Sequence, residues 1–125
     1  MINKTKISYL TKEGRKSLIV SLNQYKSEHW RKLKNRIDPL KLKFCSMIRE
    51  AKPPKLKWME LRVEHNTNFD IDNLAGTIKI FVDCLRKEEV IEEDDKRFWD
   101  YMSIKYNPGM EKNYLSFEIF GETKN

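Results

Sequence analysis

The stretch FDIDNLAGTIKIFVDCL, residues 69–85, is the clearest structural signal in this chain. Its large apolar residues recur at i, i+4, i+7, i+8 and i+11, which on a helix form one stripe about 100° wide. These residues are Leu74, Ile78, Phe81, Val82 and Leu85. Asp72 suits the N-cap position, where its carboxylate meets the positive end of the helix dipole. The stretch therefore predicts an amphipathic helix that begins after the aspartates and packs on a core.

Acidic residues flank this helix at both ends. Asp70 and Asp72 precede it, and the turn Glu92-Glu93-Asp94-Asp95 follows it. Mg²⁺ and Mn²⁺ prefer oxygen ligands and keep open positions for water and phosphate oxygens. If the two ends converge, they form a site for such a cation.

The opposite side of the same helix carries a polar line. Asp72, Lys79 and Asp83 are seven and then four residues apart, which aligns them at about 100° per residue. Taken alone, this line favours a solvated face with an ordinary Lys–Asp pair.

The segments before residue 69 predict an α+β order. Strands are expected at Lys6–Leu10 and Ser17–Leu22, around a turn at 11–15 whose turn residue is Gly14. Ser27 is a suitable N-cap for a helix through Ile37. Asp38-Pro39 predicts a kink or restart, followed by a helix over Leu40–Ala51. Apolar and polar residues then alternate over Leu56–His65, which indicates a strand.

After the acidic turn, strands are expected at Tyr101–Tyr106 and Tyr114–Phe120. The loop between them contains Asn107-Pro108-Gly109, which favours a hairpin. We therefore expect a small single domain over residues 1–125, of the α+β class. Its mixed or antiparallel sheet has about four to five strands and packs with two to three helices.

Length and composition narrow the class of protein. The chain has 125 residues, and no apolar run approaches the roughly 18 residues that span a bilayer. Met1-Ile2-Asn3-Lys4 shows no apolar signal region. Cys45 and Cys84 are predicted to be free thiols in a reducing compartment. We expect a cytoplasmic protein without a membrane partner.

Charge is distributed unevenly along the chain. Residues 1–51 carry 13 Lys and Arg against 4 Asp and Glu, whereas residues 66–125 carry 8 against 13. Attraction between a basic and an acidic half is one explanation. A basic surface that gathers phosphates and steers DNA is the explanation that we favour, because the acids concentrate in a narrow segment.

The ordered motifs resemble those of RusA-type Holliday junction resolvases, which are crossover junction endodeoxyribonucleases. The resemblance rests on Asp70-Ile71-Asp72-Asn73-Leu74, then Lys79, Asp83 and Leu85, and the acidic turn at 92–95. It extends more weakly to Ser21-Leu22-Asn23-Gln24-Tyr25 and His29-Trp30-Arg31-Lys32. It covers about residues 18–120, and it is specific over 69–95.

This resemblance implies a function in DNA recombination and repair. The chain would resolve four-way junctions by Mg²⁺-dependent phosphodiester hydrolysis, with Mn²⁺ as a substitute and no small-molecule cofactor. Asp70, Asp72 and Asp94 would hold the metal, and Lys79 would complete the catalytic set. Ungapped counting from Asp83 favours Asp94 in the turn, with Asp95 as the alternative.

The resemblance also implies partners and a source. It implies a homodimer that binds DNA. The protein would be encoded by a bacterium, or by a phage or prophage. The basic residues expected to contact DNA are Lys26, Arg31, Lys32, Lys34 and Arg36. His29 and His65 have no metal-ligand spacing to the cysteines, so structural roles are favoured. The alternative function is a nucleic-acid-binding protein or metal-dependent nuclease that is non-catalytic or differently specific.

Overall fold

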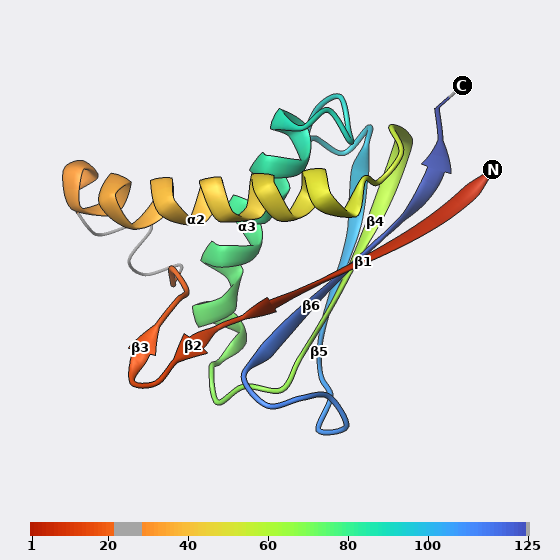
Figure 1. The fold of residues 1–125 in the computed structure, drawn as a ribbon. Helices are drawn as coiled ribbons and strands as arrows, with labels where there is room; N and C mark the ends of the chain where they lie inside the picture. Colours follow the sequence, from red (N-terminus) through yellow and green to blue (C-terminus); the bar gives the residue numbers. More distant parts are fainter. Residues whose placement is uncertain (22–28, 125) are drawn as a thin grey trace.

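A computed structural model describes residues 1–21 and 29–124 and confirms the α+β class. The elements are β1 (Ile2–Leu10), β2 (Lys12–Glu13), β3 (Lys16–Ser17), α2 (Trp30–Ala51), β4 (Leu56–His65), α3 (Ile71–Lys87), β5 (Trp99–Tyr106) and β6 (Tyr114–Thr123). The long strands form one mixed sheet in the order β1-β6-β4-β5, and β2 and β3 form a separate hairpin (Figure 1). Ser27 and Lys26 lie outside the described residues.

Alternation along the strands directs one face of the sheet to the helices. Met59, Leu61 and Val63 of β4 are fully buried, whereas Trp58, Glu60 and Arg62 lie on the other face. The core is aromatic where the helices meet the sheet. Phe81 of α3 stacks on Phe117 of β6 with ring centroids 3.8 Å apart, and Phe44 of α2 meets both rings edge-on. This is the packed stripe that the 69–85 pattern predicts.

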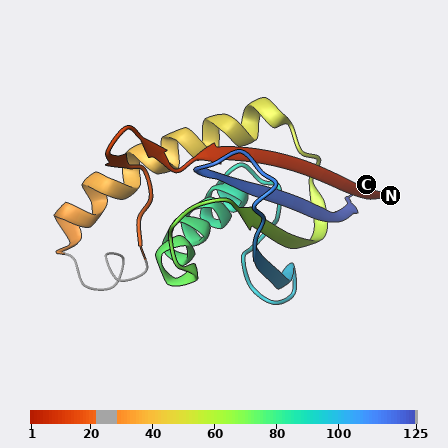
Figure 2. The same ribbon diagram turned by 90° about the horizontal axis from the view of Figure 1, so that it is seen from below.

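The predicted interruption of α2 is wrong. The helix runs for 22 residues with Pro39 inside it, and His29 is its N-cap, whose side chain accepts from the Arg31 N–H. Proline removes one backbone donor, but Pro39 is exposed, so water can satisfy the carbonyl that loses its partner. The N-terminal half of α2 projects beyond the end of the sheet (Figure 2).

The expected hairpin of the last two strands is also wrong. β4 lies between β5 and β6, pairing with β5 in parallel and with β6 antiparallel. The loop at 107–113 passes the end of β4 and is held there by Asn66, which exchanges backbone hydrogen bonds with Asn113 and Tyr114. The Asn66 side chain also donates to the Met110 carbonyl at 2.7 Å. β4 therefore pairs with β5 and is the second neighbour of β6, beside β1, and no tight turn joins β5 to β6.

The segment after β1 is shorter in strand content than expected. Of the predicted strand Ser17–Leu22, Leu22 lies outside the described residues, and among residues 17–21 Ser17 alone belongs to β3. Gly14 occupies the hairpin turn with φ of +60°. Residues 18–20 instead run against α3. The Thr77 hydroxyl accepts from the Val20 N–H at 2.8 Å and donates to the Val20 carbonyl at 3.1 Å. Neither α2 nor α3 has an apolar stretch long enough to cross a membrane.

Candidate functional site

Asp70 and Asp72 lie together at the start of α3. Asp70 is the N-cap residue, so the cap is two residues earlier than the sequence suggested, and its side chain makes no capping hydrogen bond. Its backbone carbonyl accepts from the Asn73 and Leu74 N–H groups. Asp72 lies in the first turn, where the helix dipole favours a carboxylate. Both side chains are exposed.

The acidic turn lies at the opposite end of α3. The helix has 17 residues and is therefore about 25 Å long at roughly 1.5 Å per residue. Residues 88–98 continue from its C-terminal end toward the beginning of β4, where Leu56 N–H donates to the Val90 carbonyl and Met59 N–H to the Phe98 carbonyl. Asp70 follows the other end of β4. The structure thus does not bring Asp94 or Asp95 to Asp70 and Asp72.

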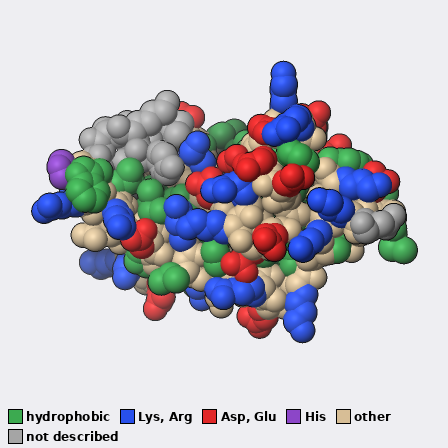
Figure 3. All heavy atoms as spheres, turned by 90° about the horizontal axis from the view of Figure 1, so that it is seen from above, with side chains coloured by type: hydrophobic (Ala, Val, Ile, Leu, Met, Phe, Trp, Pro, Cys, Tyr) green, Lys and Arg blue, Asp and Glu red, His purple; other side chains and the backbone are tan. Residues whose placement is uncertain are grey.

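Glu92 of the turn, and Glu88 and Glu89 just before it, pair with nearby cations. Ion pairs join Arg49 to Glu88 at 3.2 Å, Lys55 to Glu89 at 3.6 Å and Lys124 to Glu92 at 3.8 Å. Seen from above, acidic and basic side chains are interspersed on this end of the molecule (Figure 3). Of these three pairs, Arg49–Glu88 joins the basic part of the chain, residues 1–51, to the acidic part, residues 66–125, whereas Lys55 and Lys124 come from outside the basic part.

Asp95 has its own partner. Its carboxylate accepts from Arg97 Nε at 3.0 Å and from Arg97 Nη2 at 2.7 Å, and it also accepts from the Arg97 backbone N–H. These hydrogen bonds hold the pKa of Asp95 below its usual value. The side chain of this alternative metal ligand therefore closes a local turn.

The predicted Mg²⁺ ligands do not form a metal centre in this arrangement. Within residues 1–21 and 29–124, no three or more His, Cys, Asp or Glu side chains form a group that could hold a metal ion. Lys79 is exposed two turns beyond Asp72, on the predicted polar side of α3. The assignment of Asp70, Asp72, Asp94 and Lys79 to metal binding or catalysis stays a prediction from sequence.

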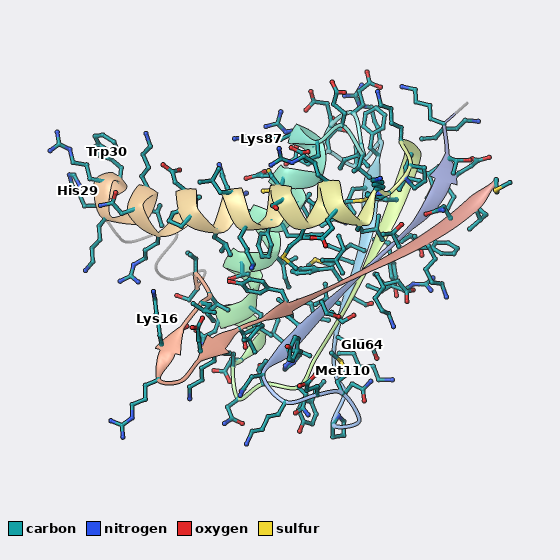
Figure 4. All side chains as sticks on the ribbon, in the orientation of Figure 1. Lys16, His29, Trp30, Glu64, Lys87 and Met110 are labelled. Atoms are coloured by element: carbon teal, nitrogen blue, oxygen red, sulfur yellow. The ribbon has the colours of Figure 1, made fainter. Side chains whose placement is uncertain are left out.

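The basic residues divide between two flanks of α2. Helical spacing puts Arg31 and Lys34 on the side of α2 that carries Cys45 and Arg49, which neighbour Cys84 of α3 and its C-cap Glu88. Arg36 and Lys43 lie on the flank that faces the β2–β3 hairpin, and helical spacing puts Lys32 on the same flank. Lys16 of β3 extends toward α2 from the facing hairpin (Figure 4). We call Lys16, Lys32, Arg36 and Lys43 the basic arc.

Lys16 and Lys43 were not among the residues predicted to contact DNA. The signal for Lys43 was available, because it lies seven residues after Arg36 and so on the same side of a continuous helix. The predicted break at Pro39 obscured it. For Lys16 the sequence held no such signal, because only the tertiary fold places the hairpin beside α2.

The open face of the sheet is electrically balanced. Its charged residues are Lys4, Lys6, Arg62 and Lys105 against Glu60, Glu64, Glu118 and Glu122. Arg62 pairs with Glu60 at 3.0 Å and with Glu118 at 3.7 Å, and it lies over the Phe120 ring. This face therefore lacks the excess positive charge that a phosphate backbone requires.

Comparisons with known proteins do not identify a family. No family model and no curated protein matches the sequence. Solved structures of 2C-methyl-D-erythritol-2,4-cyclodiphosphate synthase match at 16% identity, and at 17% for a CDP-bound form, each with a TM-score of 0.43. Each match covers 96% of this chain and 97% of the synthase chain. A HypE–HypF complex matches at 14% identity and a TM-score of 0.43, with 99% of this chain aligned to 34% of that chain.

These findings contradict the identification as a RusA-type junction resolvase. The sequence matches no family model, and the matched structures above are a synthase and a HypE–HypF complex. The enzyme class, crossover junction endodeoxyribonuclease, is corrected with it. The motif at 69–95 is similar in spacing, but here the helix between its two acidic parts keeps them apart. At these identities and TM-scores, the matched structures carry no argument about what this chain does.

Proposed function

We propose that this protein binds DNA through the basic arc and the projecting half of α2. The observation that carries the proposal is the charge of α2 from Trp30 to Lys43. Residues 30–43 contain six Lys and Arg and one acid, Asp38. Backbone phosphates attract such a surface at any base sequence, because binding releases condensed counterions.

The geometry of α2 suits a polyanion. From Lys32 to Lys43 the helix rises about 16 Å, so the arc reaches several phosphates along one strand. Trp30 is 62% exposed at the end of the helix, with the Arg31 guanidinium 5.5 Å from its ring centroid. An exposed aromatic ring beside cations offers a surface for a nucleic-acid base.

Salt titration with charge variants tests the proposal. Fluorescence anisotropy of a labelled duplex, repeated at several KCl concentrations, gives the slope of log K against log salt. Lys32→Gln and Arg36→Gln should each lower the magnitude of that slope by about 0.9, the value for one lost phosphate contact. Lys105→Gln, on the balanced sheet face, is the matched control and should leave the slope unchanged.

Equal slopes in wild type and in both arc variants would contradict the proposal. Arg31→Gln and Lys34→Gln test the other flank in the same titration, because these residues also stay predicted DNA contacts. The predicted homodimer is a separate proposal, which light scattering of the protein with and without duplex measures directly.

A further inference from the structure

A cavity of about 660 Å³ lies between the β2–β3 hairpin, the end of β1 and α2. Its size falls in the range of roughly 300–1,000 Å³ that is typical of small-molecule sites. The wall is largely apolar and includes Tyr9, Leu18, Ile19, Leu40 and Met47. Tyr9 and Leu40 are buried, so an entering group would meet packed side chains.

The rim of the cavity is cationic. Lys16, Arg36 and Lys43 of the basic arc line it, against one acid, Glu13. Asn35 and Ser17 add an amide and a hydroxyl that can hydrogen-bond a polar edge. In Figure 4 the Lys16 side chain extends from the hairpin toward α2, across the opening between them.

Hydrogen bonds hold the cavity wall in place. The Tyr9 hydroxyl donates to the Leu18 carbonyl, and Thr77 binds both backbone groups of Val20. Thr11 anchors the start of the hairpin, because its N–H donates to the Asn113 carbonyl and its carbonyl accepts from the Leu18 N–H, both at 2.8 Å. The wall is therefore fixed by β1, α3 and the loop before β6.

We propose that this cavity binds one nucleotide unit, with the base against the apolar wall and the phosphate on Lys16, Arg36 and Lys43. The cavity combines the two features that such a ligand needs, an apolar recess and an anion-binding rim. The inference deepens the proposed DNA binding and rests on it for the source of the nucleotide. An unpaired nucleotide of DNA and a free mononucleotide share this chemistry.

Methyl resonances of the wall residues test occupancy directly. Titration with dAMP should shift the methyl signals of Met47 and Ile19, whereas the Met102 methyl on exposed β5 should not move. Deoxyadenosine and inorganic phosphate, titrated separately, should each bind at least about tenfold more weakly, because each lacks half of the ligand. The inference is overturned if dAMP moves none of the wall signals, or if phosphate alone binds as well as dAMP.

Two serine variants distinguish the sources. Ser17→Trp fills the opening at an exposed strand position, and Ser46→Trp adds the same ring on the solvent side of α2. Wild type and Ser46→Trp should bind a duplex with one unpaired adenosine about tenfold more tightly than the blunt duplex, and Ser17→Trp should lose that preference.

The outcomes of the two proposals are separable. Salt-dependent duplex binding with no preference for the unpaired nucleotide and no dAMP shifts refutes the cavity inference and leaves DNA binding intact. Wall shifts with dAMP but no DNA binding support the nucleotide site, assign it to the free ligand and refute the proposed function.

Discussion

Gly76 of α3 is the position where one added methyl group tests the wall of the cavity. A Cβ atom at Gly76 would lie 2.5 Å from the Val20 carbonyl oxygen and 2.8 Å from that of Ser21. Both contacts are with backbone, which cannot rotate away as a flexible side chain would. We expect Gly76→Ala to push residues 20–21 off α3 and to break the two hydrogen bonds of Thr77.

The size of the effect follows from opposing contributions. Alanine in place of glycine favours a helix by about 1 kcal/mol. Against this, the two hydrogen bonds between Thr77 and Val20 contribute about 1 kcal/mol each, and a buried N–H left without an acceptor costs about 1–3 kcal/mol. The net expectation is that Gly76→Ala lowers the free energy of unfolding by about 2–4 kcal/mol.

Urea unfolding monitored by tryptophan fluorescence measures this change. Thr77→Val, which removes the hydroxyl without adding a Cβ, should lower the free energy of unfolding by a similar amount. Ser46→Ala, on the exposed side of α2, should stay within about 0.5 kcal/mol of wild type. Gly76→Ala should also weaken dAMP binding. A Gly76→Ala protein that is more stable than wild type and binds dAMP equally well would refute the close approach of α3 to residues 20–21.

Three further predictions concern titratable groups and metal. Burial lowers the pKa of His65 in the folded protein, so on acidification the imidazole is protonated in the unfolded chain before it is in the folded one. The free energy of unfolding should therefore fall as pH drops below about 6.5, and it should fall less in His65→Gln. Burial and the neighbouring Cys45 raise the pKa of Cys84 to about 12, so iodoacetamide at pH 8 should label Cys45 before Cys84 by mass spectrometry. Mg²⁺ at millimolar concentration should not raise Tm, because α3 separates Asp70 and Asp72 from Asp94.

Each of these has a clear opposing result. An identical pH profile in wild type and His65→Gln would place the titration elsewhere. Equal labelling of both thiols would mean that Cys84, whose thiol lies 3.6 Å from the Lys41 carbonyl oxygen, is open to solvent. A Tm that rises with Mg²⁺, and that loses the rise in Asp70→Asn, would restore the predicted metal site.

The sequence alone determined the helix and the strand in which buried and exposed residues alternate with a regular period. Leu56–His65 forms β4 with the predicted bounds, and the apolar stripe from Leu74 to Leu85 lies within α3. Side-chain alternation and the 3.6-residue repeat are properties of a single segment, so both were predictable. The turn at Gly14 was also predictable from the sequence, because glycine favours a left-handed turn conformation without any distant contact.

Only the tertiary structure decided which segments meet. The insertion of β4 between β5 and β6 depends on hydrogen bonds between residues far apart in the chain, and no local pattern encodes that order. The same holds for the two acidic groups, which the sequence places on either side of one helix and which the structure keeps at its opposite ends. Residues 18–21 form one wall of the cavity because they pack on α3, where Thr77 binds Val20 and Gly76 leaves room for the backbone. No pattern in the sequence of that segment predicts this packing.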